Sequence, residues 1–186
     1  MIRRLEFLRK QWDYYLILER RVTATSQYVD FDVKNYDTFS NEYANLLLSI
    51  CAEADVMFKI VCGFETSNTY NISHYKSELA NDLSSIEVDA PNYHLPTLIP
   101  FFEWDESKSY RFNSKTKPFW WEAYNKVKHN RFDYMEMANL KNVVYALGGL
   151  FILENHMLRI IADEYNCIYG PDRFSGLFEI KVFRVV

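Results

Sequence analysis

The segment FWWEAYNKVKHNR, residues 119–131, holds the side chains best suited to chemistry on a phosphate. Asn125 and His129 are four residues apart, so on a helix they lie on one face. Lys128 continues this group onto the adjoining face, toward Arg131. Nearby bases favour the uncharged imidazole of His129, the form that a general base needs. The pattern predicts a site that holds a phosphate and moves a proton, although a histidine on a helix also serves purely structural roles.

Positive charge is concentrated around this segment. From Lys108 to Arg131 there are seven bases and one acid, which leaves the rest of the chain with a net charge of −10. Aromatic residues alternate with the bases, and phosphate contacts combined with base stacking are typical of single-stranded nucleic-acid binding. We therefore add Lys126, Tyr124 and Trp121 as candidate substrate-binding residues. The alternative interpretation is a solvated basic face beside aromatic residues of the core.

The order of these residues resembles a known family. Tyr124-Asn125-x3-His129-Asn130-Arg131, placed just before a long apolar helix, resembles the R-[polar]-x3-H motif of the HEPN superfamily. The run from Ser49 to Asp55 resembles the acidic helix that accompanies this motif in several HEPN-like proteins. The resemblance covers roughly Thr38 to Tyr165, without an insertion.

The resemblance implies a helical bundle that acts on RNA as an endoribonuclease without metal or cofactor. It also implies a homodimer with two motifs facing each other across a cleft, and a role in phage defence or in a toxin–antitoxin pair with a partner protein. His129 matches the motif histidine and Asn125 the polar residue, whereas Tyr124 occupies the arginine position. A tyrosine brings no positive charge to the transition state, so Lys128 or Arg131 would have to supply it.

Glu53 is a candidate for orienting the site. It lies three residues after Ile50 and four before Met57, at the edge of an apolar helical stripe. A carboxylate at the edge of a core needs a partner, because burying it alone is costly. Lys128 and Arg131 are the expected partners. The pair would either hold two helices together or orient His129 or Arg131.

Apolar residues recur every three or four positions along most of the chain, which predicts an all-α fold. We expect a single HEPN-like domain, residues 1–186, built as a four- or five-helix bundle. An irregular insertion at about 90–117, with a small hairpin, interrupts it, and a short strand follows Pro171. The expected helices span Ile2–Tyr28, Thr38–Gly63, Ile72–Val88, Pro118–Arg131 and Asn139–Tyr165. Gly148 and Gly149 in the last helix suggest the close approach of another backbone.

Composition excludes several classes of protein. A net charge of −4 and a pI near 5.6 argue against a surface that binds polyanions everywhere, but leave room for one basic cleft. Cys51, Cys62 and Cys167 predict reduced thiols, and the N-terminus has no secretory h-region. The longest apolar run, Val143–Leu153, is shorter than the roughly 20 residues of a membrane span. We therefore expect a cytoplasmic protein with no membrane partner.

Three classes of function remain open. The first is the HEPN-like, RNA-directed protein with endoribonuclease activity. The second is a non-catalytic module that binds RNA, a nucleotide or a protein partner, with aromatic residues on its interaction surface. The third is a small-molecule enzyme in the core of the bundle, which lacks sequence support: there is no Glu-x-x-His pair, glycine-rich loop or GxSxG. His74, His94 and His156 show no metal-ligand spacing and receive no role.

Overall fold

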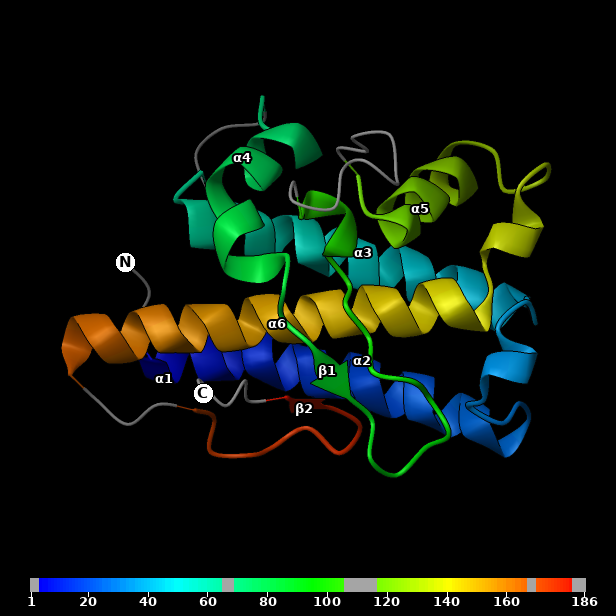
Figure 1. Ribbon diagram of the computed structural model, residues 1–186, viewed down its shortest axis with the longest axis horizontal. Helices are drawn as coiled ribbons and strands as arrows, with labels where there is room; N and C mark the ends of the chain where they lie inside the picture. The colour runs from blue at the N-terminus through cyan, green and yellow to red at the C-terminus, as the bar shows by residue number, and fades with distance from the viewer. Residues whose placement is uncertain (1–3, 65–68, 106–116, 167–169, 182–186) are drawn as a thin grey trace.

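The structure, a computed structural model, describes residues 4–64, 69–105, 117–166 and 170–181 and is built mostly of helices (Figure 1). The predicted all-α class is confirmed. Two long helices, α3 (Asn41–Cys62) and α6 (Leu140–Tyr165), lie side by side and form the most extensive contact between elements. Their first turns meet, since the Leu140 N–H donates to the Thr38 carbonyl at 3.0 Å. The two helices therefore run in the same direction, and a long connection must carry the chain back.

The N-terminal helix completes the first layer. It consists of α1 (Arg4–Phe7), a π-helical turn (Leu8–Trp12) and α2 (Asp13–Ala24). α2 packs against α3 and α6 and runs opposite to them (Figure 1). The predicted single helix over 2–28 is therefore shorter at its C-terminal end, where a 3-10 turn at Thr25–Gln27 replaces it.

The long connection supplies a second layer. α4 (Ile72–Leu83) packs against α3, and α5 (Phe119–His129) packs against both α3 and α6 (Figure 1). α4 ends five residues before the predicted boundary at Val88, because that residue belongs instead to a strand. Pro118 is the N-cap of α5 rather than its first residue.

Side-chain caps set the ends of the two central helices. Ser40 Oγ accepts the Tyr43 N–H at 3.0 Å, so α3 begins after Ser40 and not after Thr38. Asn139 caps α6 in the same way, so this helix begins at Leu140, one residue after the predicted start. Gly63 ends α3 with a φ of 68°, a left-handed conformation that favours glycine and that the sequence placed correctly.

A two-stranded sheet joins the segment that follows α4 to the C-terminal segment of the chain. β1 (Val88–Asp89) pairs antiparallel with β2 (Glu179–Ile180), which confirms the predicted strand after Pro171. The expected hairpin in the insertion is only partly within the described residues, because 106–116 lie outside them. Phe102–Trp104 forms a 3-10 turn rather than a strand.

The aromatic excess is mainly a property of the core. All four tryptophans are buried, and Trp120 Nε1 donates to the Pro100 carbonyl at 2.8 Å. A Cβ added at Gly149 would come within 2.8 Å of the Trp120 ring. The glycine pair therefore admits the close approach that the sequence suggested, made by side chains rather than by backbone.

One helix in the described part of the chain, α6, is long and apolar enough to cross a membrane by length and composition. Its most apolar window is 78% buried inside the protein. Such burial is typical of a helix in the core of a protein. α6 contacts helices of both layers, namely α2, α3 and α5.

Candidate functional site

The amphipathic pattern of α5 decides which predicted side chains reach the surface. Its inner face carries Trp120, Trp121, Tyr124 and Val127, all buried against the α3–α6 layer. From Lys128 to Tyr134 every residue is exposed, and Lys126, one residue before the buried Val127, is half-buried. We call the basic and aromatic residues of this stretch the α5 tip, which consists of Lys126, Lys128, His129, Arg131, Phe132 and Tyr134.

His129 is the last residue of α5 and its side chain is exposed. Asn125 lies one turn earlier on the same side and is half-buried, and its Nδ2 donates to the Trp121 carbonyl at 3.0 Å. The amide proton in this bond is committed to the backbone, so the Asn125 carbonyl oxygen and second amide proton are left for other contacts.

The bases of the α5 tip differ in their partners. Lys126 pairs with Glu122 at 3.1 Å, which neutralises it locally. Lys128 and Arg131 are exposed and make no ion pair with the part of the chain that the structure describes. The Lys128 Nζ lies 5.3 Å from the centroid of the Tyr124 ring. Two uncompensated cations therefore flank His129, while Lys108, Arg111 and Lys115 lie outside the described residues.

The aromatic rings predicted to stack on a substrate are covered. Trp121 is 6% exposed and packs edge-on against Phe58, with ring centroids 5.7 Å apart. Tyr124 is 7% exposed. Trp121 packs in the core and Lys128 lies over the Tyr124 ring, so neither ring is open to a base. The exposed aromatic side chains at the tip are instead Phe132, at 96% exposure, and Tyr134, at 37%. Phe132 escaped the sequence analysis because it follows the helix and breaks its periodicity.

Glu53 faces another acid rather than the basic helix. Within the described residues it forms no ion pair with Lys128 or Arg131, so the expected partnership is not present. Burial raises the pKa of Glu53, and the charge of Glu53 in turn helps to raise the pKa of Glu154. Glu154, on α6, is fully buried, and both of its carboxyl oxygens lack a hydrogen-bond partner in the described structure.

The environment of Glu154 favours its protonated form. Burial is the largest cause of its raised pKa, and the charge of Glu53 is the second. These two acids belong to the α3–α6 contact, and no observation connects them with His129.

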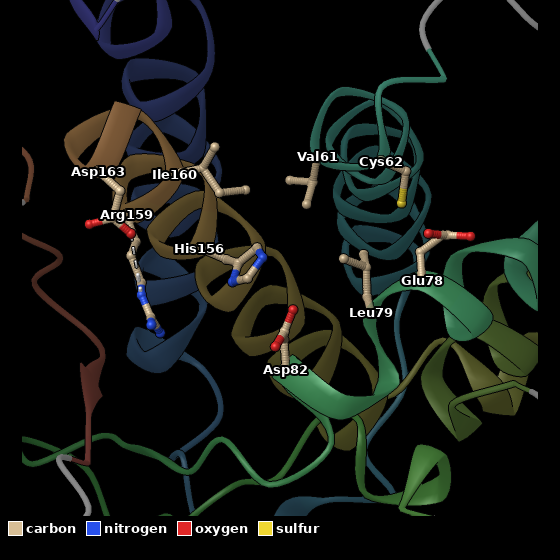
Figure 2. Close-up of a pocket in the computed structure, with 9 residues that line it drawn as sticks. All are labelled: Val61, Cys62, Glu78, Leu79, Asp82, His156, Arg159, Ile160 and Asp163. Atoms are coloured by element: carbon tan, nitrogen blue, oxygen red, sulfur yellow. Dashed lines mark ion pairs between the residues drawn. The ribbon is translucent and has the colours of Figure 1, made fainter. Parts of the chain in front are cut away.

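A separate pocket of about 410 Å³ lies between the ends of α3, α4 and α6 (Figure 2). His156 and Asp82 point toward the same space, and Cys62 lies on the side of Glu78 (Figure 2). Burial lowers the pKa of His156, an effect that Asp82 partly offsets. Burial also raises the pKa of Cys62 to about 12, so its thiol is not a nucleophile at neutral pH. Cys62 and His156 both line the pocket, but no hydrogen bond joins them within the described residues.

We assigned His156 no role from the sequence, although the charged residues around it are spaced to share a face of each helix. Glu78 and Asp82 are four apart on α4, while His156 and Arg159 are three apart on α6. What the sequence lacks is the packing that brings these two faces together. Among the described residues there is no group of three or more His, Cys, Asp or Glu placed to hold a metal ion.

The chemistry that the α5 tip supports is phosphate binding beside an exposed imidazole. Cations at Lys128 and Arg131 attract a phosphate, and His129 lies within the same stretch of chain. Cys51 and Cys62 are free thiols, as expected, and Cys167 lies outside the described residues. Comparisons with family models, curated proteins and solved structures find no match to this chain.

Proposed function

We propose that this chain is a HEPN-like, RNA-directed protein that binds single-stranded RNA at the α5 tip. The observation that carries the proposal is the joint exposure of Lys128, His129 and Arg131 beside the almost fully exposed ring of Phe132. Unpaired cations bind phosphates, and an exposed aromatic ring stacks on a base without regard to sequence. The negative charge of the remaining chain confines RNA to this one surface.

The proposal predicts that Lys128→Ala and Arg131→Ala each weaken binding of a labelled single-stranded RNA by about threefold to tenfold, because each removes one phosphate contact. The measurement is fluorescence anisotropy at one fixed salt concentration. Arg9→Ala is the matched control, since Arg9 is an exposed base on the N-terminal helix. Equal affinities for all four proteins would contradict the assignment of the α5 tip.

Cleavage of RNA is a second candidate function, favoured by the placement of Asn125 and exposed His129 on one face of α5. In this reaction His129 removes the proton of a 2′-hydroxyl or protonates the departing 5′-oxygen, and the 2′-oxygen is the nucleophile. Tyr124 is buried, so Lys128 or Arg131 would supply the cation that the HEPN motif takes from arginine. The exposed α5 tip forms only one side of a cleft, and the second copy of the chain in a homodimer would form the other side.

The cleavage candidate predicts that RNA is cut in the presence of EDTA and that His129→Ala slows cutting at least about 100-fold. Binding should change little in this variant. The measurement is product formation from end-labelled RNA on a denaturing gel, with light scattering to establish the oligomeric state. Equal cutting by both proteins would identify a contaminating nuclease, and binding without cutting would restrict the chain to the binding function.

Only the HEPN resemblance points to a cellular role for the protein. It suggests a cytoplasmic protein of phage defence or of a toxin–antitoxin pair, with an antitoxin or another defence component as its protein partner. A partner that covers the α5 tip should compete with RNA for Lys128 and Arg131. Competition in the anisotropy measurement would therefore detect it.

A further inference from the structure

The pocket of about 410 Å³ between the ends of α3, α4 and α6 has two kinds of lining (Figure 2). Val61, Leu79 and Ile160 are apolar and pack against the core of the protein. Glu78 and Asp82 line the same pocket from α4 and are exposed. The volume falls within the range of roughly 300–1,000 Å³ that is typical of small-molecule sites. A ligand with a hydrocarbon body and positive charge matches both kinds of lining.

The two acids of α4 are not compensated by the protein. Within the part of the chain that the structure describes, neither Glu78 nor Asp82 forms an ion pair or a hydrogen bond. Arg159 is the one arginine or lysine that lines the pocket among the described residues, and it lies 4.0 Å from Asp163 on its own helix. The Arg159–Asp163 pair is neutral as a whole, so two negative charges remain for a ligand.

His156 adds an acceptor without adding a positive charge. Its ring points toward the same space as Asp82, and it makes no hydrogen bond with the described residues (Figure 2). Burial lowers the pKa of His156, an effect that Asp82 partly offsets and that Arg159 reinforces. The imidazole is therefore neutral at pH 7, and its unprotonated nitrogen can accept an N–H.

The spacing of the acids narrows the class of ligand. Glu78 and Asp82 are four residues apart on α4, which places their Cβ atoms about 5–6 Å apart. Two ammonium groups joined by a short alkyl chain have a comparable separation. A metal ion fits less well, because the described residues hold no group of three or more His, Cys, Asp or Glu placed to bind one. A phosphate would be repelled by both carboxylates.

The pocket is separate from the α5 tip. Figure 1 shows α4 and the end of α6 at one end of the bundle, whereas the turn that follows α5 lies at the other. The acids of the pocket and the bases of the α5 tip therefore attract ligands of opposite charge at opposite ends of the protein. An inference about this pocket does not rest on the proposed function.

We propose that the pocket binds a short aliphatic diamine or polyamine. One ammonium group pairs with Glu78 and a second pairs with Asp82, and the second also donates an N–H to the imidazole of His156. The hydrocarbon chain between the two groups lies against Leu79 and Ile160. Each charged end thus meets an unpaired acid, and the chain covers apolar surface that the protein leaves open.

The test is an NMR titration with 1,4-diaminobutane at one fixed, low salt concentration. Glu78→Gln and Asp82→Asn should each weaken binding by about twofold to fivefold, because each removes one partly exposed ion pair. The double variant should bind about tenfold more weakly. Glu136→Gln is the matched control, since Glu136 is an exposed acid that precedes α6, far from this pocket along the helix. It should bind as the unaltered protein does.

A second ligand tests the requirement for two charges. Butylamine has the same chain with one ammonium group, so it should bind the unaltered protein about twofold to fivefold more weakly than the diamine. The double variant should lose most of this preference. Thermal melting with and without the diamine checks folding, because a bound ligand stabilises the unaltered protein and should stabilise the double variant less.

The outcomes decide the proposal. Absence of diamine binding, equal affinity for butylamine, or an equal loss in Glu136→Gln would each overturn it, the last by indicating general attraction to an acidic protein. Tighter binding of a short lysine-containing peptide than of the diamine would also overturn it and would identify a protein partner instead. RNA binding at the α5 tip is measured separately and is unaffected by any of these results.

Discussion

Replacing Glu154 with methionine is expected to raise the free energy of unfolding by about 1–4 kcal/mol at pH 7. Glu154 is fully buried, and neither carboxyl oxygen has a hydrogen-bond partner in the described structure. Methionine fills a similar volume and needs no partner. The measurement is urea denaturation of both proteins at pH 7, and a less stable Glu154→Met variant would contradict the placement of the acid.

The pH dependence of this difference follows from the sign of the pKa shift. Burial raises the pKa of Glu154 well above its ordinary value of 4.5 in the folded protein, so as the pH rises above about 4.5 the unfolded chain releases this proton before the folded protein does. The contribution to stability is full below about pH 4.5 and falls as pH rises, at up to about 1.4 kcal/mol per pH unit. The advantage of Glu154→Met should therefore grow between pH 5 and pH 7, and a constant advantage would argue against a buried, protonated acid.

Replacing Glu19 with alanine is expected to have the opposite effect, a loss of about 2–4 kcal/mol in the free energy of unfolding. Glu19 is only 4% exposed, but its carboxylate is well satisfied. It accepts the Tyr15 hydroxyl at 2.7 Å and the Gly176 N–H at 2.8 Å, and the Ser175 hydroxyl also donates to it. Truncation leaves these donors without their acceptor.

Hydrogen exchange would show where the stability is lost. Glu19 ties α2 to the turn that precedes β2, so Glu19→Ala should expose the amide protons of residues 176–180 to exchange. Ser175→Ala keeps the carboxylate but removes one donor to it, together with the acceptor of the Phe178 N–H at 2.8 Å, so it should cost about 1–2 kcal/mol, less than Glu19→Ala. If Glu19→Ala were as stable as the unaltered protein, the C-terminal segment would have to be held by other contacts.

Local rules made the helices predictable. The apolar stripe from Leu46 to Val61 and the C-terminal stop at Gly63 each follow from a few neighbouring residues, and the structure confirms them. Boundaries failed where tertiary pairing intervened. Val88 was assigned to a helix by its spacing, but it pairs with Ile180, more than ninety residues later in the chain.

The helix that carries the predicted site is confirmed, whereas the site itself stays a prediction. Asn125 and His129 share a face because helical geometry requires it, and Lys128 is exposed. Trp121 and Tyr124 are buried, a result that depends on where α3 packs and not on the local pattern. Glu154 is recognisable in the sequence as a charged residue within the apolar stripe between Phe151 and Leu158.

The path of residues 25–40 could not be predicted from the sequence. Residues 25–40 contain two 3-10 turns and no periodic pattern, so their path depends on hydrogen bonds to distant backbone such as that from Ser40 to Ala138. The exposure of Phe132 likewise depends on the turn after α5, in which Asn130 Nδ2 donates to Asp133 at 2.5 Å. Irregular segments acquire their shape from the rest of the fold.

The dependence of RNA affinity on salt tests the central claim most directly. A plot of the logarithm of the binding constant against the logarithm of the salt concentration has a slope of about −0.7 for each phosphate contact made with a single strand. The account predicts that a variant with both Lys128→Ala and Arg131→Ala binds more weakly and has a slope smaller in magnitude by about 1.4. A variant with the affinity and slope of the unaltered protein would contradict RNA binding at the α5 tip.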